Sequence, residues 1–212
     1  MPGMKKIAVL VSGLGTNLQT IIDAIKNGRL NNVDIAAVIS NKKDAFALER
    51  AKNAGIETVF LNPKDFTSNT DYDKKLIEVI SNYKVDLIVL AGYMKILTDN
   101  FVNAFKNKII NIHPALLPDF GGKGMYGKNV HEAVLKSGVK ESGCTVHFVT
   151  TEVDAGPIIV QRKVSVIPGD TVESLSKRIL VEEHKLLIKA INKVLSPLRH
   201  CEERSDEAIS KM

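Results

Sequence analysis

The stretch Ile7-Ala8-Val9-Leu10-Val11-Ser12-Gly13-Leu14-Gly15-Thr16-Asn17-Leu18 decides the fold class of this chain. Its first five residues form an unbroken apolar run, which is typical of a strand buried on both faces of a parallel sheet. A helical pattern begins after the glycines, with apolar residues at Leu18, Ile21, Ile22 and Ile25. The sequence therefore predicts a strand, a glycine loop and a helix in direct succession.

This glycine loop has the features of a phosphate site. A helix N-terminus directs backbone N–H groups at an anion. Gly13 and Gly15 would let the backbone approach it closely, and Thr16 and Asn17 add side-chain donors. The third glycine of a dinucleotide fingerprint is missing, and no acid closes the second strand. The pattern favours a monophosphate site over an NAD site, with a merely tight turn as the alternative.

Strand-like and helix-like segments then alternate along the chain. Strand runs at 33–39, 58–61 and 85–92 are separated by helical patterns at 45–54 and 72–83. This alternation predicts an α/β protein with an open, doubly wound, mostly parallel sheet. Ligands bind such sheets beyond the carboxyl ends of strands, where three loops are expected: 12–17, 92–95 and 111–118.

The C-terminal part differs in character. Residues 119–128 are glycine-rich without apolar periodicity, which fits either a lid or a plain surface connection. The segments 143–151 and 158–166 alternate like the two strands of an antiparallel hairpin. A long amphipathic helix is expected from Thr171 to Leu195. We expect a single domain over 1–197 and, because large apolar residues become rare, a disordered tail over 198–212.

Asn111-Ile112-His113-Pro114 closes another apolar run and is the strongest chemical motif. Asn111 and His113 are two residues apart, so on an extended strand their side chains point the same way. Asp154 lies in a tight Gly-Pro turn. An amide to bind an oxyanion, an imidazole to carry a proton and a carboxylate to orient it are the parts of an acyl-type transfer site. The alternative is that His113 has a structural role at a strand end.

Composition and charge narrow the classes of protein that fit. A chain of 212 residues suffices for one α/β domain with a full core. The net charge of +5 suits an anionic substrate, although a solvated basic surface accounts for it equally well. No Lys/Arg run with interleaved aromatics indicates a nucleic-acid face. No apolar stretch approaches the ~20 residues of a membrane span, and the strand-like run that follows the N-terminus is too short for the apolar region of a secretory signal.

The cysteines and histidines indicate a reducing cytoplasm and no bound metal. The two cysteines, Cys144 and Cys201, do not make a disulfide framework. The five histidines are scattered, and no cysteine pair has the spacing of a zinc site.

Four motifs occur together in the order found in one enzyme family. They are 12–18, 90–97 (Leu-Ala-Gly-Tyr-Met-Lys-Ile-Leu), 111–118 (Asn-Ile-His-Pro-Ala-Leu-Leu-Pro), and 145–149 followed by 154–157 (Asp-Ala-Gly-Pro). Over residues 4–195 the chain resembles the phosphoribosylglycinamide formyltransferases, folate-dependent enzymes of purine synthesis. The resemblance implies the formyltransferase fold, with a nucleotide-binding half at about 4–110 and a half at about 111–197 that completes the folate and catalytic cleft.

The implied reaction moves a formyl group from 10-formyltetrahydrofolate, as co-substrate, to the amine of glycinamide ribonucleotide. The residues that hold the ribonucleotide are matched by Gly15, Thr16, Asn17 and Glu183. The segment that lines the folate site is matched by Met94, Lys95, Ile96 and Leu97. The catalytic trio is matched by Asn111, which also borders the folate, His113 and Asp154. His147 matches a strand histidine that we expect to support the site without touching substrate. A monomer and a homodimer both remain open.

Two positions depart from the family. Lys95 stands where many members carry Arg, and a lysine lacks the bidentate geometry with which arginine binds a carboxylate. Asn69 falls where some members have a folate-contacting Arg, and the residues after Leu195 match nothing.

In the expected mechanism, the substrate amine attacks the formyl carbon, and Asn111 with a protonated His113 stabilises the oxyanion. Asp154 should keep His113 charged nearer neutral pH. The main rival is a formyltetrahydrofolate deformylase, which uses water as the nucleophile but normally carries an additional N-terminal domain. A methionyl-tRNA formyltransferase would need a C-terminal RNA-binding domain, for which there is no room after Leu195. A non-catalytic nucleotide- or folate-binding module is the rival from another class.

Overall fold

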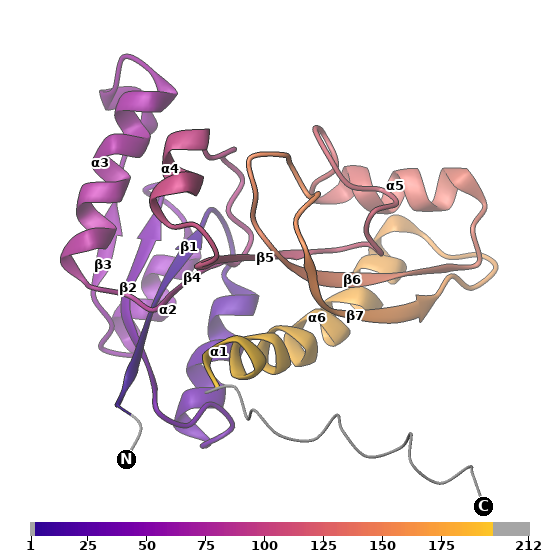
Figure 1. Cartoon of the computed structure of the whole chain (residues 1–212). Helices are drawn as coiled ribbons and strands as arrows, with labels where there is room; N and C mark the ends of the chain where they lie inside the picture. The colour runs from indigo at the N-terminus through magenta and orange to yellow at the C-terminus, as the bar shows by residue number, and fades with distance from the viewer. Residues whose placement is uncertain (1–2, 197–212) are drawn as a thin grey trace, which may run out of the picture.

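The computed structural model of the chain describes residues 3–196, so the predicted tail at 198–212 lies outside the described residues. Within them, one seven-stranded sheet has the order β3-β2-β1-β4-β5-β6-β7 (Figure 1). The parallel strands are β1 (Lys5–Val11), β2 (Val33–Ser40), β3 (Thr58–Phe60), β4 (Leu87–Leu90) and β5 (Ile109–His113). Two antiparallel strands follow, β6 (Glu141–Phe148) and β7 (Ile158–Ser165). The predicted mostly parallel sheet with antiparallel C-terminal strands is confirmed.

Helices cover both faces of this sheet. They are α1 (Thr16–Lys26), α2 (Phe46–Asn53), α3 (Asn69–Asn82), α4 (Asp99–Ala104), α5 (Lys128–Ser137) and α6 (Val172–Leu195), with a short 3-10 turn at Pro63–Asp65. The predicted long C-terminal helix is confirmed as α6, and a capping box between Thr171 and Ser174 fixes its start. Within residues 3–196, none of the helices has the length and apolar character needed to cross a membrane.

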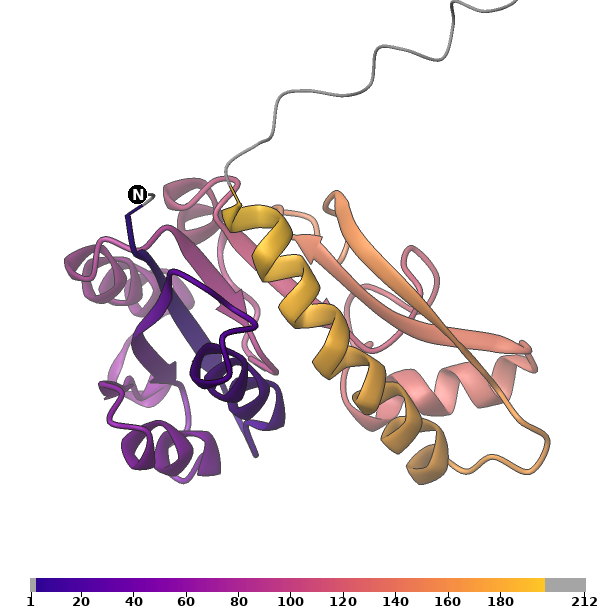
Figure 2. The same ribbon diagram turned by 90° about the horizontal axis from the view of Figure 1, so that it is seen from below.

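Two apolar cores, one on each face, explain the unbroken apolar run of β1. Ile7, Val9 and Val11 point into the core shared with α1, α2 and α6. Ala8 and Leu10 point into the opposite core, beneath α3 and α4. Since successive side chains of a strand alternate between faces, a strand covered on both sides must be apolar throughout. Figure 2 shows α6 running obliquely beneath the sheet, next to α1 on one side and to β6 and β7 on the other.

The strand order places a topological switch point between β1 and β4. From β1 the chain moves outward to β2 and β3, then returns to the other side of β1 as β4 and continues to β5. The loops after β1 and β4 therefore leave neighbouring strand ends in opposite directions, which opens a crevice at their carboxyl ends. The three loops expected to bind ligands follow β1, β4 and β5.

Candidate active site

Asn111, His113, His147 and Asp154 come together at the end of β5. Asn111 on β5 faces His147 on β6 directly in the antiparallel register. Asp154 lies between the two imidazoles: its Oδ2 is 3.6 Å from His113 Nδ1, and its Oδ1 is 3.6 Å from His147 Nε2. Both histidines are almost fully buried, at 3% and 1% exposed. The structure thus unites the amide, the imidazole and the carboxylate that the sequence singled out, with His147 between Asn111 and Asp154.

The Asp154 turn is tightly constrained. Asp154 has a positive φ of 57°, an uncommon conformation for a residue with a side chain. Gly156 must be glycine, because a Cβ there would lie 1.8 Å from the Phe148 carbonyl oxygen. The Gly122 N–H donates to Asp154 Oδ2 over 3.0 Å. Burial raises the pKa of Asp154, but the two histidines and this N–H outweigh it, so the pKa lies below its usual value. The carboxylate is held rigid and ionised.

The pKa of His113 corrects one expectation. Burial lowers this pKa and outweighs the opposing effects of Asp154 and of the Phe120 carbonyl, so it lies below the usual 6.5. Asp154 raises the pKa of His113, as predicted, but the net shift is downward because burial, which has no signature in the sequence, outweighs it. The Phe120 carbonyl lies 2.8 Å from His113 Nε2 and can only accept. In neutral His113 the proton is therefore on Nε2, and Nδ1, which lies 3.6 Å from Asp154 Oδ2, is the nitrogen that can accept a proton.

His147 orients Asn111. Its Nδ1 is 2.9 Å from the Phe148 carbonyl oxygen, which can only accept, so Nδ1 carries a hydrogen. In the neutral ring Nε2 is then an acceptor, and Asn111 Nδ2 lies 3.2 Å from it. With this tautomer, the NH₂ end of the Asn111 amide is the one that faces His147. One hydrogen of that group is engaged and the second remains to donate elsewhere.

The glycine loop after β1 serves packing as well as any ligand. Gly15 precedes α1 in the left-handed conformation, at φ 71°. A Cβ at Gly15 would lie 2.6 Å from Ala47 Cβ on α2, whereas a Cβ at Gly13 would meet nothing within 4 Å. Gly15 is therefore required by the close approach of α2 to the loop, a reason that the sequence did not reveal. Thr16 is the first residue of α1 and is half-buried.

Asn17 and Glu183, both expected near the ribonucleotide, contact each other. Asn17 Nδ2 on α1 donates to Glu183 Oε2 on α6 over 2.9 Å, and each residue is 8% exposed. Burial raises the pKa of Glu183, with the Asn17 bond opposing the shift. One of the Asn17 amide hydrogens that were expected to reach a phosphate is therefore engaged by Glu183. Glu183 is therefore buried rather than on the solvated face of α6.

The residues expected to line the folate site form the loop after β4. Met94 and Ile96 are exposed, at 47% and 57%. Lys95 Nζ donates to Asn69 Oδ1, so the two positions that depart from the family contact each other. Leu97 packs against the core beneath α3.

Several contacts at the site were not anticipated from sequence. Ser12 Oγ donates to Asn41 Oδ1 and accepts from the Met94 N–H, which ties the loop after β1 to the loop after β4. The Phe120 carbonyl and the Gly122 N–H meet the two catalytic candidates, although the 119–128 segment received no site assignment. The position of Ser12, directly after a buried strand, was an available signal. Backbone contacts from a glycine-rich loop leave no signal in residue types.

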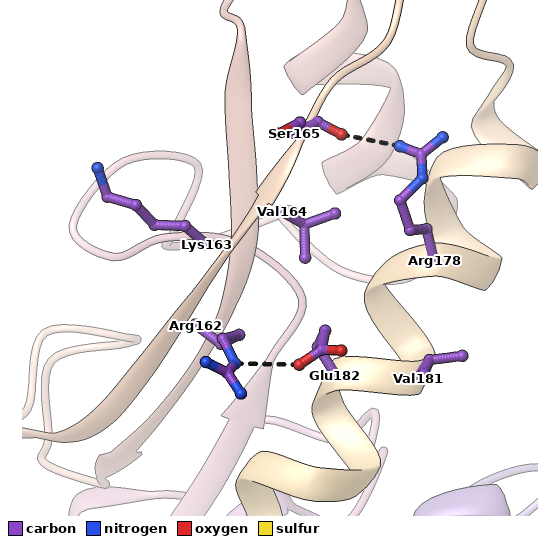
Figure 3. A pocket seen from close by; sticks show the side chains of 7 residues that line it. All are labelled: Arg162, Lys163, Val164, Ser165, Arg178, Val181 and Glu182. Atoms are coloured by element: carbon purple, nitrogen blue, oxygen red, sulfur yellow. Dashed lines mark hydrogen bonds and ion pairs between the residues drawn. The ribbon is translucent and has the colours of Figure 1, made fainter.

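A surface pocket elsewhere has a different character. It measures about 490 Å³, lies between β7 and α6, and shares no residue with the histidine cluster (Figure 3). Arg162 Nε pairs with Glu182 over 3.0 Å, and Arg178 Nη1 donates to the Ser165 carbonyl. Its guanidinium groups are thus engaged by the chain itself. Across residues 3–196, no group of three His, Cys, Asp or Glu side chains has an arrangement suited to a metal ion.

Comparison with known proteins agrees with the fold and shows the family. The family model described as formyl transferase matches residues 5–191, and the chain belongs to the formyl transferase family. Within it, phosphoribosylglycinamide formyltransferase of Haemophilus influenzae is 49% identical over 184 residues, which are 86% of this chain and 84% of the relative. The enzyme of that name from Escherichia coli is 45% identical over 180 residues, 85% and 82% of the two chains.

A solved structure shows the same arrangement. Glycinamide ribonucleotide transformylase 1 of Symbiobacterium toebii superposes with a TM-score of 0.85 at 47% identity, covering 90% of this chain and 87% of that one. The resemblance identified from the four motifs is confirmed.

Proposed function

We propose that this protein transfers a formyl group from 10-formyltetrahydrofolate to the amine of 5-phosphoribosylglycinamide, in de novo purine synthesis. The observation that carries the proposal is the cluster at the end of β5, where Asp154 lies 3.6 Å from the imidazoles of both His113 and His147. Membership of the formyl transferase family, and relatives named for this reaction, support it.

Asn111 and His113 carry the chemistry. The substrate amine attacks the formyl carbon and places negative charge on the formyl oxygen. The free hydrogen of the Asn111 NH₂ group, whose other hydrogen faces His147, stabilises this oxyanion. Loss of one such donor usually costs ~10²–10³ in rate.

A proton must also move from the amine to the departing folate nitrogen. His113 is mainly neutral at rest because burial lowers its pKa, so it can accept the proton that the attacking amine loses. The resulting imidazolium is stabilised by the Asp154 carboxylate and the Phe120 carbonyl. His113 then delivers the proton to the folate nitrogen, and the C–N bond to folate breaks. The nucleophile is the substrate itself, so no serine or cysteine is needed.

The two substrates approach from the loops at the switch point. Gly15, Thr16 and Asn17 at the start of α1 hold the ribonucleotide phosphate through backbone N–H groups, with Glu183 beside them. Met94 to Leu97 line the folate site. In this assignment residues 4–110 form the nucleotide half and residues 111–197 complete the cleft. Both substrates are small molecules, and we place the enzyme in the cytoplasm as a monomer or homodimer.

The decisive test measures folate release with and without the amine. Purified protein is incubated with 10-formyltetrahydrofolate, and tetrahydrofolate formation is followed by absorbance, with and without 5-phosphoribosylglycinamide. Release that depends on the amine supports the transferase. Release without it indicates a deformylase, and no release under either condition indicates a binding module. Asp154→Asn should lower the rate of amine-dependent release by about 10² or more, while the matched control Asp99→Asn, on the exposed start of α4, should leave it unchanged.

A further inference from the structure

The loop between β4 and α4, residues 91–98, is fastened to one face of α3 at three places. On the helix the contact residues are spaced i, i+3 and i+4, which puts them on a single face. The contacts join Tyr93 to Tyr72 through their hydroxyls at 2.8 Å, Lys95 to Asn69 through an ammonium–amide bond, and the Thr98 N–H to Asp73 Oδ2 at 2.6 Å. The start, middle and end of the loop are thus each bound to the first turns of α3.

Burial of the Asp73 carboxylate has a high free-energy cost for a contact that is only structural. The residue is 0% exposed, and its Oδ2 accepts only the Thr98 N–H, while Oδ1 and Thr98 Oγ1 have no partner among the described residues. A buried carboxylate with so few hydrogen bonds destabilises a fold. Burial is the main cause that raises the pKa of both Tyr72 and Tyr93, and the charge of Asp73 adds to it.

Side chains of the loop at 93–97 alternate between facing α3 and facing solvent. Tyr93 and Leu97 pack on the core beneath α3, and Lys95 Nζ lies 4.9 Å from the centre of the Tyr72 ring. The intervening Met94 and Ile96 are the exposed ones, at 47% and 57%. An extended segment has this two-residue alternation, so holding the odd-numbered side chains on α3 turns the two large apolar side chains outward. Such preorganisation lowers the entropic cost of binding a flat ligand.

We propose that Tyr72, Tyr93 and Asp73 are positioning residues for the folate substrate, which set the loop so that Met94 and Ile96 offer a preformed apolar surface to its ring system. This assignment rests on the proposed function. The three residues act on folate only through the loop, and they leave the ribonucleotide loop after β1 untouched.

The test removes single hydroxyls. Tyr93→Phe and Tyr72→Phe each keep the ring and leave one buried hydroxyl without its partner. Each should raise both KM for formyl folate and the calorimetric Kd for tetrahydrofolate about 3- to 10-fold, the cost of one such hydrogen bond. KM for the ribonucleotide should stay within about twofold. The double variant should be no worse than either single one, because both partners are then apolar. Tyr83→Phe is the matched control, since that hydroxyl bonds Glu57 at the far end of α3.

Asp73→Ala should likewise weaken folate binding, and Asp73→Asn should restore much of it because an oxygen remains to accept the Thr98 N–H. Equal rises in KM for both substrates, or a lowered melting temperature with unchanged folate binding, would assign these residues a structural role and overturn the proposal. A wild-type protein that fails to bind tetrahydrofolate would instead refute the proposed function, and this assignment with it. If Asp73→Ala does not fold, the tyrosine variants still decide.

Discussion

Replacing Glu183 by alanine and by glutamine separates its structural role from its proposed contact with the ribonucleotide. Its Oε2 accepts from Asn17 Nδ2 at 2.9 Å, across the packing of α6 on α1. Asn17 Oδ1, equally buried, has no partner among the described residues. Glu183→Ala would leave both polar atoms of the Asn17 amide without a partner. A buried unsatisfied group costs about 1–3 kcal/mol, so the melting temperature should fall by roughly 2–12 °C for a domain of this size.

Glu183→Gln should behave in the opposite way. It keeps an acceptor for Asn17 Nδ2 and adds a donor for Asn17 Oδ1. It also removes a charge that the site disfavours, since burial raises the pKa of Glu183 above its ordinary 4.5. A carboxyl whose folded pKa is raised loses stability as pH rises from the unfolded value through the folded one. The stability gained by Glu183→Gln over wild type should therefore be small below pH 4.5 and grow above it.

Thermal unfolding followed by circular dichroism between pH 4 and 8 measures both effects. The matched control is Glu182→Gln, because the neighbouring Glu182 pairs with Arg162 and Lys185 at the surface. Its replacement should change the free energy of unfolding by less than ~1 kcal/mol. The reasoning fails if Glu183→Gln destabilises as much as Glu183→Ala, or if its advantage shrinks with rising pH. KM for the ribonucleotide should rise in both Glu183 variants even where glutamine stabilises the fold, if the carboxylate contacts that substrate.

Two further predictions concern the loop after β1 and the catalytic histidine. Gly15→Ala should lower the melting temperature, because its Cβ would lie 2.6 Å from Ala47 Cβ at φ 71°, whereas Gly13→Ala, with nothing within 4 Å, should not. Because Gly13→Ala should not disturb packing, calorimetry of that variant with the ribonucleotide measures only whether a side chain at Gly13 weakens ligand binding. Equal melting temperatures for the two variants would contradict the packing argument. The acid limb of the kcat/KM profile should lie below pH 6.5, because burial lowers the pKa of His113 and the reaction needs its neutral form. Asp154→Asn removes a charge that raises this pKa, so the limb should move to still lower pH; a wild-type limb above 6.5 would refute neutral His113 as the proton acceptor.

Local patterns predicted much of the fold and several residues of the candidate site. The apolar run of β1 indicated a strand covered on both faces, and Ile7 and Ala8 indeed enter opposite cores. The two-residue spacing of Asn111 and His113 was also a local signal. Asn17 and Glu183, 166 positions apart, gave none, because their contact depends on how α6 crosses α1.

The net direction of the His113 pKa shift could not be predicted from the sequence for a related reason. Sequence identified Asp154 as a charge that raises it, but desolvation depends on how the loop through Phe120 closes over the imidazole. Burial is a property of the assembled fold, so its competition with a charge partner has no sequence signature. Likewise, Lys95 and Asn69 appeared as separate departures from the family until the structure joined them.

The most direct test of the central claim is kcat for amine-dependent tetrahydrofolate release in His113→Ala, Asp154→Asn and the double variant. If His113 carries the proton and Asp154 stabilises its charged form, each single change should lower kcat by about 10² or more with ribonucleotide affinity nearly intact. The double variant should lose far less than the product of the two single losses, because both residues act on one proton. Asn111→Ala, which removes an oxyanion donor, should instead largely multiply with the loss at His113. Near-wild-type turnover in His113→Ala, or single losses at His113 and Asp154 that simply multiply, would contradict the proton-transfer role assigned to this pair.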